Sequence, residues 1–390
     1  MKILITGAQG FIGKNLISEL KNRGYHDLCL CHRGTTEEEL NIYTRECDFI
    51  FHLAGVNRPQ RAEEFMEGNF GFTEHLLGML QKYQNKASIV CTSSTQAILD
   101  NPYGRSKLAG EKLLLQYAER VKSKVIIFRL TNVFGKWCRP EYNSVVATFC
   151  HKIACDVPIQ VNDEEALLKL IYIDDVVNSL ITFMEMELNV KQDNHKHSLM
   201  LPDLEDRYYI EPVYDIKLGK LANLIKSFKE SRKNLHVPDM SDDFTKKLYS
   251  TYLSYLPEDE FSYSLKMNVD DRGSFTEFLK SESFGQVSVN ISKPGITKGN
   301  HWHHTKNEKF LVVSGKGIIR FRKVSDFAND QDVKEEVLEY IVSGEKLQVI
   351  DIPTGYTHNI TNTGDTDMVT IMWANESFNP DKPDTYFLEV

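Results

Sequence analysis

Residues 1–13 read MKILITGAQGFIG, a short apolar strand that runs into a glycine-rich turn and opens a stretch of helical period. The three glycines of the turn are Gly7, Gly10 and Gly13. Glycine lets the chain turn tightly, approach a pyrophosphate closely and pack the following helix on the strand. The N-terminus of that helix offers unpaired N–H groups and a positive dipole end to phosphates. The stretch therefore predicts a dinucleotide-binding strand–turn–helix unit at the start of the chain.

The hydrophobic pattern divides the rest of the chain into two parts. Up to about residue 255, stretches of helical period alternate with short apolar runs, which lie at 28–32, 48–54, 88–94 and 124–130. This alternation predicts an α/β fold, a Rossmann-like doubly wound parallel sheet with helices on both faces. A polar stretch at 189–215 is interpreted as a loop of this part.

From residue 267 onward, short strand-like runs are separated by Gly, Pro and Asn, which is typical of an all-β sandwich or barrel. We therefore expect two domains, residues 1–255 and 266–390.

Composition restricts the class of protein. No apolar run reaches the roughly 18 residues of a membrane helix, and the first residues lack a signal peptide's apolar core. We expect a cytoplasmic protein with no membrane partner. The net charge of −9, with no Lys/Arg-rich stretch, argues against a nucleic-acid partner. The cysteines number seven and form no CxxC pair, which favours free thiols over disulfides or a cysteine zinc site.

The residues after the second strand indicate the cofactor. An NAD site usually places Asp or Glu there, whereas an NADP site places Arg to contact the 2′-phosphate. The sequence has His32-Arg33-Gly34, with no acid before Glu37. We predict NADP(H) as cofactor, with Arg33 on the phosphate; the alternative is that Arg33 is a solvated surface residue.

Tyr103 and Lys107 form a YxxxK pair at the start of a predicted helix, where residues i and i+4 share a face. The ammonium of Lys107 favours the phenolate of Tyr103, so the phenol can exchange a proton with a carbonyl or alcohol oxygen. Upstream, the run CTSS ends a predicted strand with two serines. Ser94 is the preferred hydrogen-bond donor to the same oxygen, and Ser93 is the alternative candidate for that role.

Six motifs together resemble the extended short-chain dehydrogenases/reductases that act on nucleotide sugars. They are TGAQGFIG (6–13), HLAG (52–55), CTSS (91–94), PYGRSK (102–107), RLTNVFG (129–135) and YIDDV (172–176). The resemblance implies that Tyr103, Lys107 and Ser94 are catalytic and that Asn132 contacts the nucleotide sugar. It implies these cofactor contacts: Gly7, Gly10, Phe11, Ile12, Gly13, His32, Arg33, Leu53, Ala54, Gly55, Tyr103 and Lys107. The family's 4,6-dehydratases carry an Asp-Glu pair where this chain has Thr95-Gln96, which favours ketone reduction over dehydration.

The C-terminal part contains a candidate metal-ligand set: His301, His303, Glu308 and His358. His301 and His303 alternate on a predicted strand, so both point to one face. Three imidazoles and one carboxylate suit Zn²⁺ or another divalent transition metal. The alternative is that these histidines line a sugar pocket without metal.

Residues 295–315 and 353–362 resemble the two cupin signatures, which implies a cupin barrel with one bound metal ion. Residues 271–301 also resemble the nucleotide-4-keto-sugar 3,5-epimerases, which are cupin-fold barrels without metal. That resemblance implies that Arg272 and Glu277, together with Lys298, hold the nucleotide sugar. It gives His301 a competing role as the base that removes a proton beside a ketone. If His301 binds a metal, the base must be another residue. The candidates are then Lys298 and Tyr356.

Taken together, the two halves resemble bifunctional capsular-polysaccharide enzymes along nearly the whole chain. The resemblance implies a UDP-linked 4-keto-6-deoxy amino sugar, UDP-2-acetamido-2,6-dideoxy-hexos-4-ulose, as substrate. C3 epimerisation by the cupin domain and NADPH-dependent C4 reduction would give UDP-N-acetyl-6-deoxytalosamine, a precursor of UDP-N-acetyl-L-fucosamine. The C3 proton is acidic only while C4 is a ketone, so epimerisation must come first. The alternative is a 4-ketoreductase whose cupin is a non-catalytic dimerisation or binding module; we expect a homodimer.

Overall fold

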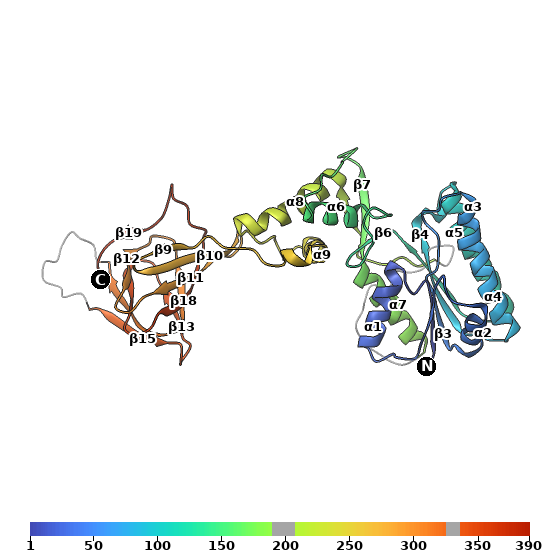
Figure 1. The fold of residues 1–390 in the computed structure, drawn as a ribbon, viewed down its shortest axis with the longest axis horizontal. Coiled ribbons are helices and arrows are strands. Elements are labelled where there is room, and N and C mark those ends of the chain that lie inside the picture. Colours follow the sequence, from blue (N-terminus) through green and yellow to red (C-terminus); the bar gives the residue numbers. More distant parts are fainter. Residues whose placement is uncertain (189–206, 325–335) are drawn as a thin grey trace. The chain divides into compact units, whose positions relative to one another are not determined.

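The computed structural model describes residues 1–188, 207–324 and 336–390 (Figure 1). These residues form two compact units, 1–226 with 247–257 and 227–246 with 258–390. Most of the loop expected at 189–215 lies outside the described residues, and its last two residues begin β8 (Tyr214–Lys217).

The first unit is built on a parallel sheet in the order β2-β1-β3-β4-β5, as the alternating pattern predicts. Its strands are β1 (Ile3–Thr6), β2 (Leu28–Cys31), β3 (Phe49–His52), β4 (Ser88–Ser94) and β5 (Val125–Leu130). Its helices are α1 (Phe11–Asn22), α2 (Glu37–Glu46), α3 (Glu63–Met66), α4 (Phe72–Lys82), α5 (Pro102–Val121), α6 (Val145–Ala154) and α7 (Ile173–Glu187).

Helices cover both faces of this sheet, which is why its strands are continuously apolar (Figure 1). On one face, Ile3 and Ile5 pack with side chains of α1 and α7, such as Leu16 and Leu180. On the other face, Leu4 packs in a second core that includes Leu76 and Leu114 of α4 and α5. Alternate residues of one strand therefore serve two cores.

A second, small sheet follows in the order β6-β7-β8, with β6 (Asn132–Phe134) and β7 (Leu167–Tyr172) parallel and β8 antiparallel to β7. The chain continues through α8 (Leu218–Asn234) and α9 (Asp243–Leu253). Residues 227–246 group with the second unit, although the sequence pattern placed them with the first. The reason is that Leu235 and Val237 exchange backbone hydrogen bonds with Lys280.

The second unit contains two antiparallel sheets, in the orders β16-β13-β18-β11-β10-β9 and β15-β14-β17-β12-β19. This matches the all-β character expected from the sequence. The strands are β9 (Asn268–Asp270), β10 (Gly273–Ser281), β11 (Gly285–Ser292), β12 (Thr297–Trp302), β13 (Glu308–Ser314), β14 (Lys316–Lys323), β15 (Leu338–Ser343), β16 (Val349–Ile352), β17 (Tyr356–Asn362), β18 (Met368–Ala374) and β19 (Tyr386–Phe387). Phe310, Ile319, Phe321 and Ile360 lie in its hydrophobic core.

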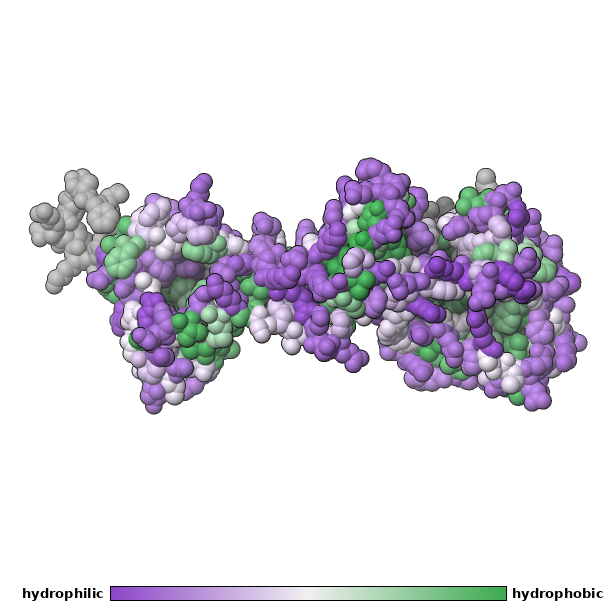
Figure 2. All heavy atoms as spheres, turned by 45° about the horizontal axis from the view of Figure 1, so that its top comes forward, coloured by the Kyte–Doolittle hydropathy of each residue, from purple (hydrophilic) through white to green (hydrophobic). Residues whose placement is uncertain are grey.

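On the face that Figure 2 shows, most of the coloured surface is hydrophilic, with hydrophobic side chains exposed in several places. Across the described ranges, no helix has both the length and the apolar character that crossing a membrane requires.

Candidate active sites

The turn between β1 and α1 is packed so closely that only glycine fits. Gly7 has a φ of +69°, and a Cβ there would lie 2.8 Å from the backbone nitrogen of Ala54. A Cβ on Gly13 would lie 2.4 Å from the carbonyl oxygen of Gly7. Helix α1 begins after Gly10 with no side-chain cap, so its first N–H groups can meet a phosphate. The residues present therefore fit a dinucleotide.

The other predicted cofactor residues differ in their surroundings. Phe11, Ile12 and Leu53 are partly buried and pack against the core. The ring of His32 closes the turn after β2, because its Nδ1 accepts a hydrogen bond from the Gly34 N–H at 3.0 Å. Arg33 follows on the same turn and is exposed, and its side chain has no hydrogen bond or ion pair within the described part of the chain.

Helix α5 presents Tyr103 and Lys107 beside the end of β4. Asn101 caps the helix by accepting the Gly104 N–H at 2.7 Å, and Pro102 occupies its first position. A Cβ on Gly104 would lie 2.4 Å from the Gln96 carbonyl oxygen. Glycine at this position therefore lets α5 lie directly on the turn that follows β4.

Lys107 and Gly55 are brought together by the fold. A Cβ on Gly55 would lie 2.9 Å from Lys107 Nζ and 2.8 Å from Asn69 Oδ1. Asn69 is buried in a π-helical turn and donates to Ser106 Oγ at 2.9 Å. Sequence reasoning missed Asn69, although the Gly-Asn-Phe-Gly run around it is a signal, since π-turns are frequent at functional sites.

The two serines at the end of β4 have different partners. Ser93 is buried, and its Oγ donates to Glu111 Oε1 at 2.5 Å. Glu111 also binds Arg129 at 2.8 Å and Arg207 at 2.8 Å. Burial alone would raise the pKa of Glu111, but the hydrogen bonds from Arg129 and its other partners outweigh burial and lower it. The Ser93 hydroxyl is thus committed to a buried carboxylate.

Ser94 is half-buried, and its Oγ accepts the Gln96 N–H at 3.2 Å. An accepting hydroxyl retains its own hydrogen for donation. The geometry therefore favours Ser94 over Ser93 as the donor to a substrate oxygen. Asn132, the expected sugar contact, is exposed on β6 and donates to the Lys169 carbonyl at 3.2 Å.

A buried histidine that sequence reasoning did not single out, His52, lies close enough to Lys107 to feel its charge. His52 Nδ1 lies 2.8 Å from Thr6 Oγ1, and its Nε2 lies 2.9 Å from Thr73 Oγ1. Thr73 donates its own hydrogen to the Asn69 carbonyl, so it accepts from the His52 Nε2–H. Burial, and then the charge of Lys107, lowers the pKa of His52 to about 3, so the ring is neutral.

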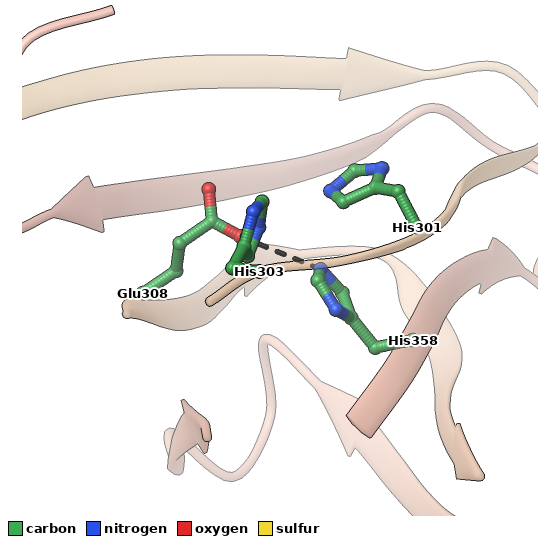
Figure 3. Close-up of side chains that lie close together, drawn as sticks. All are labelled: His301, His303, Glu308 and His358. Carbon is green, nitrogen blue, oxygen red and sulfur yellow. Dashed lines mark hydrogen bonds and ion pairs between the residues drawn. The ribbon is translucent and has the colours of Figure 1, made fainter. Parts of the chain in front are cut away.

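The four candidate metal ligands converge in the second unit (Figure 3). Their ligand atoms all lie within 4.8 Å of one another. His301 of β12 sits directly opposite His358 of β17, after a bulge at which Asn300 has a φ of +58°. Glu308 Oε2 lies 3.3 Å from His303 Nε2 and 3.4 Å from His358 Nε2.

The donor set fits a metal ion. His358 is 1% exposed, and among the described residues neither of its ring nitrogens has a hydrogen-bond partner, although Nε2 lies 3.4 Å from Glu308 Oε2. A buried polar atom is normally paired, and a metal ion would pair it. Burial, and then the charge of His358, lowers the pKa of His301 to about 4, so the imidazole is neutral, as a metal ligand must be. Burial would raise the pKa of Glu308, but His303 and His358 lower it, which keeps the carboxylate ionised.

The metal-ligand set borders a cavity of about 680 Å³ inside the second unit. His301, Glu308 and His358 line it, together with Arg272 and Lys298; its apolar lining includes Phe275, Phe310 and Met372.

Lys298 Nζ donates to Asn290 Oδ1 and to the Ile291 carbonyl, both at 2.9 Å. Burial lowers the pKa of Lys298. Arg272, the other cation of the cavity, pairs with Asp270 at 2.6 Å.

The structure does not bring Glu277 or Tyr356 into this cavity lining. Glu277 lies on β10, beside a bulge, and pairs with Lys280 at 2.8 Å. Lys298 and Tyr356 are the two alternative candidates for the base. Lys298 lines the cavity together with His301 and His358, whereas Tyr356 packs against the hydrophobic core.

Comparison with known proteins identifies the family. Residues 3–195 match the NAD dependent epimerase/dehydratase family, and residues 268–386 match the polysaccharide biosynthesis C-terminal domain. The UDP-2-acetamido-2,6-beta-L-arabino-hexul-4-ose reductase of Pseudomonas aeruginosa is 43% identical over 390 residues, which cover 100% of this chain and 99% of that protein.

Two crystal structures of the capsular polysaccharide assembling protein CapF are similar over 100% of both chains. The structure from Staphylococcus aureus has a TM-score of 0.90 at 54% identity. The structure with the inhibitor 3-isopropenyl-tropolone has a TM-score of 0.85 at 50% identity. The chain therefore belongs to the CapF family of UDP-sugar reductases, in which an NAD dependent epimerase/dehydratase domain precedes a polysaccharide biosynthesis C-terminal domain.

Proposed function

We propose that this chain is a bifunctional enzyme of capsular-polysaccharide or O-antigen synthesis. Its second unit inverts C3 of UDP-2-acetamido-2,6-dideoxy-hexos-4-ulose, and its first unit then reduces C4 with NADPH. The product is UDP-N-acetyl-6-deoxytalosamine. One observation carries the proposal: each unit contains its own convergent set of polar groups, Tyr103 with Lys107 in one and the His301 cavity in the other.

The reduction relies on the first unit. NADPH supplies a hydride to C4 when it is bound. Tyr103 donates its phenolic proton to the C4 oxygen, and the ammonium of Lys107 stabilises the phenolate that remains. Ser94 donates a second hydrogen bond to the same oxygen, in line with its unused hydroxyl hydrogen. The unpaired, exposed guanidinium of Arg33 supports a contact to the 2′-phosphate of NADPH.

The epimerisation relies on the cavity of the second unit. A base removes the C3 proton, the electron pair moves toward the C4 oxygen, and a proton returns to C3 from the opposite face. Lys298 is the candidate base: its neutral amine would take the C3 proton and become the ammonium, and burial favours the neutral amine by lowering the Lys298 pKa. Arg272, beside it on the cavity wall, supplies a cation for the pyrophosphate.

The second unit is proposed to be a cupin barrel that holds one Zn²⁺ with His301, His303, Glu308 and His358. Two observations support this: the four ligand atoms converge, and the buried ring nitrogens of His358 have no hydrogen bond within the described residues. The CapF inhibitor 3-isopropenyl-tropolone is consistent with it, since tropolones chelate divalent metals through two adjacent oxygens. A zinc with four protein ligands stabilises a fold, whereas one with an open position polarises a carbonyl. The complete ligand set favours the structural role.

A second candidate function is a reductase whose second unit binds metal but does no chemistry. The same complete ligand set favours it, because a closed site is typical of structural zinc. The two functions differ in what happens before NADPH is added.

The test incubates the full-length protein with the keto sugar in deuterated water without NADPH. Deuterium incorporation at C3, followed by NMR, is expected for the bifunctional enzyme. Lys298→Met, which keeps the length of the side chain but not its charge, is expected to lose exchange. The matched control is Lys316→Met, on β14 of the same unit, outside the cavity. NADPH oxidation by wild-type protein without any C3 exchange rejects the epimerase and leaves the second candidate.

A further inference from the structure

The last residues of the chain fold back over the strands that carry the metal ligands. β19 pairs with β12, with Phe387 opposite His301. The Leu388 N–H donates to the Asn300 carbonyl at 3.0 Å, and the Leu388 carbonyl accepts a hydrogen bond from the hydroxyl of Thr357. Residues 384–388, here called the C-terminal strap, thus bind the immediate neighbours of the ligands His301 and His358.

The carboxylate of Asp384 holds the turn between the other two ligands. It accepts the backbone N–H groups of His304 at 3.0 Å, Thr305 at 2.8 Å and Lys306 at 2.8 Å, and the Thr305 hydroxyl at 3.0 Å. These residues lie between His303 and Glu308. One carboxylate therefore fixes the segment that sets the separation of these two ligands.

The backbone carbonyl of Asp384 acts directly on His303. It lies 2.6 Å from His303 Nδ1. A carbonyl oxygen only accepts, so Nδ1 carries a hydrogen. This leaves Nε2, 3.3 Å from Glu308 Oε2, as the nitrogen that would bind the metal. Metal-ligating histidines usually donate their second ring N–H to an outer partner of this kind, which fixes the tautomer and the ring orientation.

The backbone of Asp384 is held in an unfavourable conformation. Its φ is +36°, in the left-handed region that non-glycine residues seldom occupy. Such a conformation costs free energy and persists where surrounding contacts determine it. Lys306 Nζ donates to the carbonyl of Pro383 at 3.1 Å and to Thr385 Oγ1 at 2.8 Å, which holds the chain on both sides of Asp384.

We propose that Asp384 is a positioning residue for the metal ligands His303 and Glu308, and that the C-terminal strap completes the metal site from outside the ligand set. The proposal rests on the zinc site proposed above. It extends that site to a residue far along the chain from the ligands it orients, and it predicts an effect on metal affinity rather than on the reduction.

The test measures the zinc affinity of metal-stripped full-length protein by competition with a chromophoric chelator. Asp384→Ala keeps the backbone carbonyl that contacts His303 but removes the carboxylate that holds residues 304–306. It is expected to bind zinc about 10-fold more weakly than wild type, the low end of the cost of altering an outer partner. The zinc affinity of Asp384→Asn is expected to lie between those of wild type and Asp384→Ala, because the carboxamide oxygen can still accept some of the backbone N–H hydrogen bonds. The matched control is Asp381→Ala, an exposed carboxylate of the same tail, which is expected to match wild type.

Two further readouts separate the possible failures. Melting temperatures with and without zinc are expected to show a smaller zinc-induced rise in Asp384→Ala than in wild type. If Asp384→Ala lowers the melting temperature equally with and without zinc and leaves the zinc affinity unchanged, the proposal is overturned. Asp384 then has only a general structural role. Wild-type protein that binds no zinc rejects the zinc site itself. Nitrogen-15 NMR of the zinc-free protein is expected to show the hydrogen on His303 Nδ1; a hydrogen on Nε2 alone overturns the proposal whatever the metal does.

Discussion

Ser93 Oγ donates a hydrogen bond to Glu111 Oε1 at 2.5 Å, so the hydroxyl of Ser93 is directed into the protein and not toward the end of β4. Ser94 is then the serine available to a substrate oxygen. Ser94→Ala is expected to lower kcat of NADPH-dependent reduction by about 10²-fold, the low end of a positioned proton-transfer partner's effect. Ser93→Ala is expected to leave kcat near wild type and to destabilise the protein by about 1.5–3 kcal/mol, the value of a hydrogen bond to a charged group. Steady-state kinetics and urea denaturation measure the two effects, and a larger kcat loss in Ser93→Ala contradicts the assignment.

Tyr103→Phe is expected to abolish NADPH oxidation while C3 deuterium exchange continues. In the proposed reduction the phenol gives the C4 oxygen its proton. Tyr103 lies in the first unit, whereas all residues lining the cavity belong to the second. NADPH absorbance and NMR exchange measure the two activities separately. Loss of both activities in a variant that still folds would show that the sites are not independent.

Arg33→Ala is expected to reduce the preference for NADPH over NADH. A charge-assisted bond to phosphate contributes about 1.5–3 kcal/mol, so the ratio of the two kcat/KM values should change by about tenfold or more. Lys86→Ala removes an exposed cation elsewhere in the same unit and is the control for net charge. An unchanged ratio in Arg33→Ala excludes this residue as the reader of the 2′-phosphate.

Chelation of the metal is expected to lower the melting temperature. Its effect on epimerase activity, measured well below that temperature, is expected to be the smaller of the two. The reason is that a closed four-ligand site contributes folding free energy. Elemental analysis of gently purified protein should give one zinc per chain. Complete loss of C3 exchange in a folded, zinc-free protein, restored by zinc, would instead assign the metal a catalytic role.

The stability of the first unit is expected to fall below pH 6.5 because of His52. Its pKa is about 3 in the folded chain, against an ordinary value of 6.5. Between these values the unfolded chain binds a proton that the folded chain does not, so stability decreases as pH decreases, by up to about 1.4 kcal/mol per pH unit. Above pH 6.5 the residue contributes no pH dependence. Chemical denaturation of wild type and His52→Gln between pH 4 and pH 7 measures the difference in slope.

The ring of His52 offers a check that does not depend on unfolding. Its carbon resonances are expected to stay constant from pH 8 to pH 5, while those of solvent-exposed histidines shift. A His52 titration above pH 5 would contradict both its burial and the hydrogen-bond chain from Thr6 to Thr73.

The sequence by itself determined the features that depend on neighbours in the chain. The spacing of Gly7, Gly10 and Gly13 between a strand and a helix predicts the dinucleotide-binding turn. The i, i+4 spacing of Tyr103 and Lys107 places them on one face of α5. Alternating helical and apolar segments predict the parallel sheet, because burial on both faces demands continuously apolar strands. The spacing of the histidines and Glu308 also identified the cluster that the fold assembles.

Only the tertiary structure decided the features that depend on distant segments. Ser93 and Ser94 are adjacent and chemically identical, and their roles separate only because Glu111, 18 residues away, lies on one side of β4. Glu277 matched a motif, yet a bulge and Lys280 leave it outside the cavity lining. Asp384 lies 81 residues from His303, and no local pattern links them. Local propensity and spacing act over a few residues. The hydrogen-bond partners of buried and strained groups depend instead on how strands and loops from the whole chain pack together.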